Sequence, residues 1–148
     1  MLAKELKRLA GGPGMSNVQY ALLRREGPPD RIAWQAAIDE CGFDFQLDPQ
    51  LDTARDRGFS PGTLMGGEGG FELYSGPISE LPEAAPYAAG RDCWFAFRTG
   101  SSMAECASMM IACYALAKQF DAVILPAADM DGLLQEIMDC IEEVRRGR

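Results

Sequence analysis

Five residues with a type and spacing suited to chemistry stand at the end of an apolar run at 93–97. They are Arg98, Thr99, Gly100, Ser101 and Ser102. A strand that ends here and leads into a helix would point free backbone amides and the positive end of the helix dipole at an anion. The glycine spacing of a P-loop or of a dinucleotide-binding loop is missing. A phosphate or small-ligand site, in a binding protein or an enzyme, is therefore one hypothesis, and an ordinary capped helix start is the other.

The chain contains no histidine. This excludes serine or cysteine nucleophiles activated by histidine, imidazole acid–base catalysis and histidine metal sites. An enzyme would have to use a carboxylate such as Glu72 or Glu105, and Glu105 is better explained as part of a helix cap. Aspartates recur every fourth residue at 44–56, but they lack the spacing of a calcium loop. We expect no catalytic residues, no metal site and no cofactor.

The five cysteines are an odd number without metal-site spacing. They argue against a disulfide framework and for a reduced compartment. The long apolar run at 103–120 is interrupted by Glu105 and Lys118, and it is too short to favour a membrane span. We therefore expect a cytoplasmic protein that does not bind membranes.

Negative charge is concentrated in the second part of the chain. The net charge is −8, and residues 61–148 carry 13 acidic and 6 basic side chains. Such a surface repels nucleic acid and favours a basic partner. Simple solubility would explain the same charge, so both interpretations remain open.

The elements that must position these groups are clearest around the long apolar run. Residues 93–97 and 123–126 predict short buried strands on either side of a helix at 103–120. Ser102 and Glu105 match a capping box, in which the hydroxyl accepts from the amide of residue 105 and the carboxylate reaches the amide of the cap. Because this helix is apolar on nearly every face, we expect it to be buried on more than one side.

The remaining elements are predicted by periodicity and turn residues. We expect a strand at 18–23, a helix from the cap Asp30 to Cys41, a half-buried strand at 43–47 and a polar loop at 48–57. Residues 63–65 and 71–74 predict a hairpin whose turn is the glycine-rich stretch 66–70. Residues 75–91 are irregular, with one helical turn at most. A final amphipathic helix, capped by Asp129 or Asp131, is expected to pack on the sheet.

These elements predict an α+β fold. We expect a mixed, mainly antiparallel sheet of five or six strands with two or three packed helices, a two-layer sandwich of ferredoxin-like character. A doubly wound arrangement is the alternative. Residues 1–14 differ in composition and are expected to be an N-terminal extension, with a single domain at 15–148.

One resemblance bears on function. The stretch 70–74, the stretch 95–98, the Ala/Cys/Met-rich helix and the stretch 123–126 resemble small bacterial proteins of the immunity type, over residues 17–130. The resemblance implies an acidic, cytoplasmic, non-enzymatic protein that binds a cognate toxin domain and blocks its active site. A basic toxin would be captured faster by an acidic surface.

The surface expected to bind such a partner is the acidic, loop-rich region with two tyrosines as aromatic anchors. It comprises Glu68, Glu72, Tyr74, Glu80, Glu83, Tyr87 and Asp92. Two alternatives stay open. One is the anion site at 98–102, and the other is a homodimer or other oligomeric module, since the central helix looks too apolar for one sheet face to cover.

Overall fold

The structure is a computed structural model, and it describes residues 17–24, 28–126 and 129–147. The expected extension at 1–14 therefore lies outside the described residues. The elements are β1 (Asn17–Leu23), α2 (Arg31–Glu40), β2 (Phe45–Gln46), β3 (Gly58–Leu64), β4 (Gly67–Pro77), η1 (Ile78–Glu80), η2 (Pro82–Ala84), α3 (Ala85–Ala88), β5 (Cys93–Thr99), α4 (Met103–Phe120), β6 (Val123–Leu125) and α5 (Met130–Arg146).

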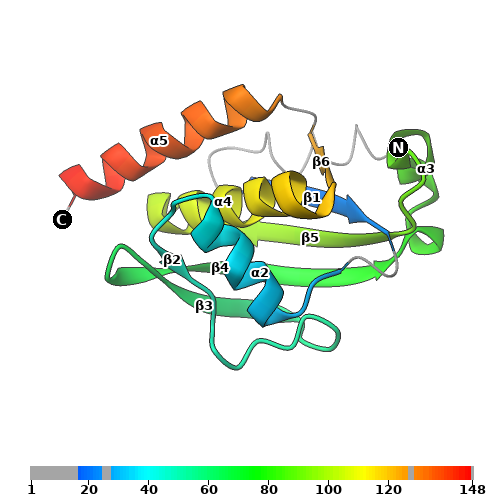
Figure 1. Ribbon diagram of the computed structural model, residues 1–148, viewed down its shortest axis with the longest axis horizontal. Coiled ribbons are helices and arrows are strands. Elements are labelled where there is room, and N and C mark those ends of the chain that lie inside the picture. The colour runs from blue at the N-terminus through cyan, green and yellow to red at the C-terminus, as the bar shows by residue number, and fades with distance from the viewer. Residues whose placement is uncertain (1–16, 25–27, 127–128, 148) are drawn as a thin grey trace.

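The strands form one six-stranded sheet in the order β2-β3-β4-β5-β1-β6 (Figure 1). Every neighbouring pair is antiparallel. Helix α4 connects β5 to β6, and β1 lies between these two strands, so the three elements form a split β-α-β unit. Helix α2 follows β1 and leads, through β2 and β3, to β4, and β5 lies between β1 and β4. Two such units are the ferredoxin-like arrangement. The predicted α+β class is confirmed, and β2 and β3 extend the sheet beyond that unit.

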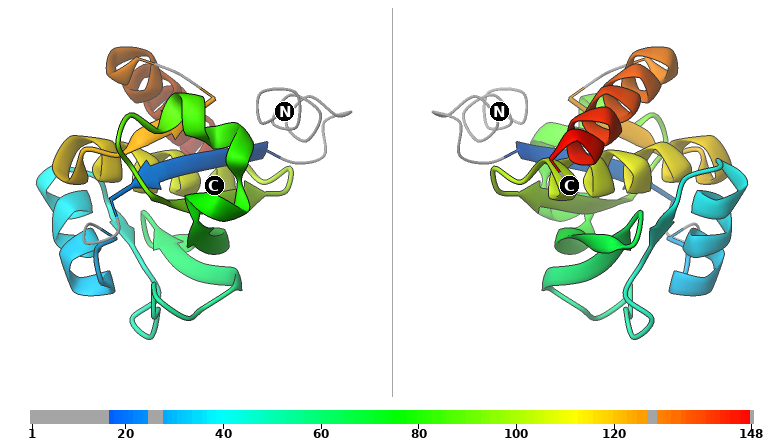
Figure 2. Two further views of the ribbon diagram at one scale, coloured as in Figure 1. Left: turned by 90° about the vertical axis from the view of Figure 1, so that its right-hand side faces the viewer. Right: turned by 90° about the vertical axis from the view of Figure 1, so that its left-hand side faces the viewer.

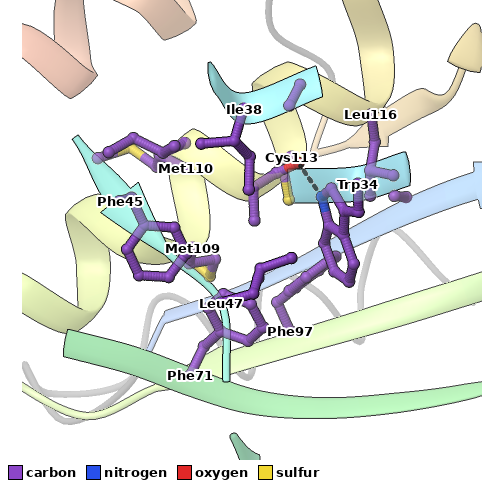
Figure 3. Packing of buried hydrophobic residues seen from close by; sticks show 14 of the residues in the cluster. Trp34, Ile38, Phe45, Leu47, Phe71, Phe97, Met109, Met110, Cys113 and Leu116 are labelled. Carbon is purple, nitrogen blue, oxygen red and sulfur yellow. Dashed lines mark hydrogen bonds between the residues drawn. The ribbon is translucent and has the colours of Figure 1, made fainter. Parts of the chain in front are cut away.

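The inner face of the sheet is covered by α2 and α4, which lie on the same side of it when the molecule is seen end on (Figure 2). At the centre of this layer lies Trp34 of α2, fully buried. Its indole nitrogen donates to the carbonyl oxygen of Ala112 at 3.2 Å (Figure 3). Its ring centroid lies 5.6 Å from that of Phe95 and 5.9 Å from that of Phe97. One aromatic cluster therefore joins α2, α4 and the central strand.

The final helix does not pack as expected. α5 makes its main contacts with α4 rather than with the sheet. It buries one stripe of aliphatic side chains, namely Leu133, Ile137, Ile141 and Val144. This arrangement explains why α4 is apolar all round, because the sheet, α2 and α5 cover it from different sides. The reason for expecting an oligomer, an uncovered central helix, is thus absent.

The glycine-rich stretch was wrongly expected to be the hairpin turn. The turn is Met65 and Gly66 alone, and the other glycines belong to β4. A Cβ on Gly69 would lie 2.6 Å from Ser108 Oγ of α4, and the amide of Gly70 donates to that oxygen at 3.1 Å. The missing side chains let α4 come close to the strand, so these glycines serve packing rather than turn formation.

Within the described structure, the outer face of the sheet is covered over β1, β6 and the part of β5 that carries Trp94. The segment Ile78–Ala88, which contains η1, η2 and α3, packs there on a small cluster of its own. The cluster contains Val18, Leu22, Ala84, Ala88 and Leu125. Figure 1 places α3 at the end of the molecule opposite the C-terminal end of α5. Among the described residues, no other element packs on the outer side of β3, of most of β4 and of part of β5.

Candidate functional site

Three residues of the predicted partner-binding set lie along the outer side of β4. Glu68, Glu72 and Tyr74 occupy alternate positions of the strand, whereas Phe71 and Leu73 point inward and are almost fully buried. Alternation along a strand puts residues an even number apart on one face. From Glu68 to the end of the strand this face extends for roughly 30 Å at about 3.3 Å per residue.

A hydrogen bond fixes the centre of this line. The Tyr74 hydroxyl donates to Glu72 Oε1 at 2.7 Å. This bond, followed by desolvation and by the nearby Glu72 charge, raises the pKa of Tyr74 above its ordinary value, although Arg98 acts in the opposite direction. Across the ladder, Phe59 of β3 and Arg98 of β5 stand directly opposite Glu72. The Phe59 side chain is exposed at 56%.

Glu80 extends the line toward the covered end of the face. The Glu80 carboxylate lies over Gly76 of β4, and a Cβ on Gly76 would collide with that carboxylate and with the Trp94 ring. The indole nitrogen of Trp94 donates to the carbonyl of Pro77 at 3.0 Å, which holds the ring over the strand. We call Phe59, Glu68, Glu72, Tyr74 and Glu80 together the β4 patch.

The other predicted partner residues lie apart from the β4 patch. Tyr87 is exposed at 43% on α3, within the segment that covers β1 and β6. Asp92 is exposed just before β5, and its backbone amide donates to Leu23 at 2.9 Å. Glu83 belongs to η2, and its side chain lies outside the described part of the structure. The structure thus gathers four of the seven predicted residues along one strand.

The structure does not bring the five predicted anion-binding residues to one place. Arg98 is exposed on the outer face, whereas Thr99 is only 1% exposed on the inner face. The Thr99 hydroxyl has no hydrogen-bond partner among the described residues. The side chains of neighbouring strand residues point to opposite faces, so an anion cannot contact both.

The turn itself is occupied by a carboxylate. Ser102 Oγ accepts from the amide of Glu105 at 3.2 Å, as the capping box predicts. The Glu105 carboxylate, however, accepts from the amide of Gly100 at 3.3 Å rather than from the amide of Ser102. Ser101 is exposed beside it. The Glu105 carboxylate therefore occupies the Gly100 amide, which is one of the hydrogen-bond donors that a bound anion would need.

Beside this turn the protein surface is hollowed. A cavity of about 270 Å³ lies between the β3–β4 hairpin and the start of α4. Phe59, Pro61, Glu68, Ser102 and Glu105 line it, together with the glycines at positions 62 and 69. We call it the hairpin hollow. It was not predicted, because the glycines and the proline at 58–62 hide the strand on which Phe59 and Pro61 stand.

A larger groove of about 580 Å³ lies elsewhere, along α5. Its walls include Phe43, Met65, Leu134 and Met138, and Arg145 lies at its rim. None of the residues predicted to bind a partner or an anion lines it. Size alone does not make it the functional site, since nothing in the described structure identifies what it would hold.

Burial disfavours the thiolate form of four cysteines, those at positions 41, 106, 113 and 140. Burial is the main cause that raises the pKa of Cys41 and Cys106, and it raises the pKa of Cys140 to about 12. A thiol with a raised pKa is a poor nucleophile at neutral pH, because the thiolate is the reactive form. Among the described residues, no group of three or more histidine, cysteine, aspartate or glutamate side chains could hold a metal ion.

Comparison with protein-family models, with curated proteins and with solved structures finds no match to this chain. Within the described residues, no helix has the length and apolar character needed to span a bilayer. The functional argument therefore depends on the outer face of the sheet alone.

Proposed function

We propose that this protein is a non-enzymatic binding protein of the immunity type, which neutralises a cognate bacterial toxin by capturing it through the β4 patch. The observation that carries the proposal is the hydrogen bond between Tyr74 and Glu72 on an open sheet face, beside the exposed Phe59. Exposed aromatic residues such as these are enriched at the centres of protein–protein interfaces.

Two further properties support a basic partner. Glu68, Glu72 and Glu80 put three carboxylates on the patch, against the single guanidinium of Arg98 on the neighbouring strand. The whole chain carries a net charge of −8. Complementary charge accelerates association and disfavours acidic competitors. The patch also stands on a sheet whose other side is packed, so little ordering would accompany binding.

The test is capture of the partner by tagged protein, with two matched charge reversals. In the first variant, Glu68→Lys and Glu72→Lys change the β4 patch. In the second, Glu136→Lys and Glu142→Lys make the same change in net charge on the exposed side of α5. We expect wild type and the α5 variant to retain one basic protein at equal stoichiometry. The patch variant should bind that protein at least about tenfold more weakly, which corresponds to about 1.4 kcal/mol of binding free energy.

A growth experiment tests the immunity part of the proposal. The captured protein should arrest growth when it is expressed alone, and co-expression of wild type should restore growth. Loss of that protection in the patch variant, but not in the α5 variant, supports the proposal. A captured protein that is harmless alone, or equal behaviour of the two variants, would contradict it.

A further inference from the structure

The hairpin hollow has features that select a particular kind of group. Among the described residues, the two charged side chains that line it, Glu68 and Glu105, are both carboxylates, and no basic side chain does so. Neither carboxylate forms an ion pair with a described basic residue. Within the described part of the chain, the Glu105 carboxylate accepts one hydrogen bond, from the amide of Gly100, and this bond is long, at 3.3 Å. Acceptor positions on both groups therefore remain available to a cation.

The walls of the hollow suit the apolar stem of a long basic side chain. The Phe59 ring and Pro61 stand on the outer side of β3, and Ser102 adds a hydroxyl oxygen near the carboxylates. Lysine and arginine bury their methylene stems against apolar surface while the charged head reaches polar groups. A guanidinium can also stack on an aromatic face.

The size of the hollow suits a single long side chain. Its volume of about 270 Å³ lies at the low end for small-molecule pockets, about 300–1,000 Å³. The hollow also shares Phe59 and Glu68 with the β4 patch, so a protein lying on the patch would cover it.

From these observations we infer that the hairpin hollow receives a lysine or arginine side chain of the basic partner, held between the carboxylates of Glu68 and Glu105. The inference rests on the proposed function for the partner's identity, but the pocket itself can be tested without that partner. It also reverses the hypothesis of an anion site at the start of α4, because the charges gathered there are negative.

The test is a titration of isotope-labelled protein with acetyl-arginine amide, followed by the amide resonances in nuclear magnetic resonance spectra. Acetyl-citrulline amide, which has the same shape without the charge, is the matched ligand control. We expect saturable shifts at Phe59, Gly62, Glu68 and Glu105 with the arginine compound only.

Two variants sharpen the titration. Glu68→Gln and Glu105→Gln each remove one charge, and glutamine at 105 keeps the capping position because it serves there as glutamate does. Each should weaken binding about two- to fivefold, as expected for a partly exposed ion pair, and the double variant should abolish saturation. Glu136→Gln on α5 should change nothing.

Several results would overturn the inference. These are shifts centred on the acidic side of α5, equal shifts with the citrulline compound, or unchanged affinity in the double variant. The proposed function fails separately. If acetyl-arginine amide binds in the hollow but no basic protein is captured, only the proposed function fails. If a basic protein is captured and the double variant binds it as tightly as wild type, only this inference fails.

Discussion

The two faces of the sheet are built by the same strands and differ in what covers them. On the inner face, Phe71, Phe95 and Phe97 pack against two helices and are at most 2% exposed. On the outer face, the segment 78–88 covers β1, β6 and part of β5, and no other described element packs on β3 or on most of β4. Neighbouring residues of β4 thus differ in role, because the Phe71 side chain is buried and stabilises the fold, whereas the Glu72 side chain faces solvent.

This difference teaches where sequence change should be tolerated. Stability depends mainly on the apolar area buried on the inner face, because burial supplies most of the favourable free energy of folding. The β4 patch contributes little to that buried area. Its residues can therefore vary to suit a binding partner without a large loss of stability. Substitutions that compare the two faces directly can break or sharpen this conclusion.

The largest expected contrast is between two phenylalanines on neighbouring strands. Phe71→Ala should lower the free energy of unfolding by about 3–5 kcal/mol, because it leaves a cavity in the inner layer. Phe59→Ala, on the open face, should change it by no more than about 0.5 kcal/mol. Urea unfolding followed by circular dichroism measures both. Comparable losses from the two variants would contradict the division between the faces.

A smaller loss is expected where α4 approaches β4. A Cβ added by Gly69→Ala would meet Ser108 Oγ at 2.6 Å and Leu64 Cβ at 3.2 Å, so the helix must shift. Such overpacking costs about 1–3 kcal/mol. Gly100→Ala is the control, since a Cβ there meets nothing within 4 Å. Thermal unfolding should show a lowered midpoint for the first variant only, and adding Ser108→Ala to it should recover part of the loss.

The contact between Arg91 and Asp121 links the outer segment 78–88 to the end of α4, and it should contribute about 1–2 kcal/mol to the stability of that segment. Arg91 follows α3, and its guanidinium lies 2.9 Å from Asp121 Oδ2 and donates to the Asp121 carbonyl at the end of α4. Arg91→Ala removes these bonds, whereas Arg24→Ala removes only a weak 3.8 Å contact to the same carboxylate. Hydrogen exchange of the 78–88 amides measures the effect. Equal protection in the two variants would show that Arg91 does not hold the segment.

The smallest effect is a pH dependence on the open face. Hydrogen bonding to Glu72 raises the pKa of Tyr74, so the folded protein holds this proton more tightly than the unfolded chain, whose value is 10.0. The associated stability is present below pH 10.0 and is lost as the pH rises through the higher folded-state pKa. Ultraviolet absorbance titration, with Tyr74→Phe to assign the signal, should show this raised pKa, and Glu72→Gln should lower it. An unchanged midpoint in Glu72→Gln would contradict the assignment.

Much of the fold could be predicted because local signals agreed with tertiary packing. The helix expected at 103–120 is α4 with the same bounds, since a capping serine at one end and a long helix-forming run leave few alternatives. The cap at Asp30 is likewise confirmed, with its carboxylate accepting from Ala33 at 2.8 Å. The first part of β3, residues 58–62, was missed because Pro61 and two glycines disfavour a strand locally, and pairing with β4 overrides them.

The candidate site was harder to predict. Glu72 and Tyr74 were chosen as a charged and an aromatic residue. The strand predicted at 71–74 puts them on one face, but it does not predict the hydrogen bond between their side chains. The hairpin hollow joins residues of β3, β4 and α4 that are distant in sequence. Periodicity reports which residues share one element, and it carries no information on which elements meet.

The placement of the two tryptophans has a practical consequence. The chain contains only two, and they lie on opposite sides of the sheet, with Trp34 in the inner layer and Trp94 in the outer cluster. Replacing either one by phenylalanine leaves a single intrinsic fluorophore that reports on one side. Stopped-flow refolding of the two variants, followed by tryptophan fluorescence, would then show whether the inner layer forms before the outer segment packs on the sheet. No added label is needed. The Trp94 signal would also report directly when another protein arrives at the neighbouring β4 patch.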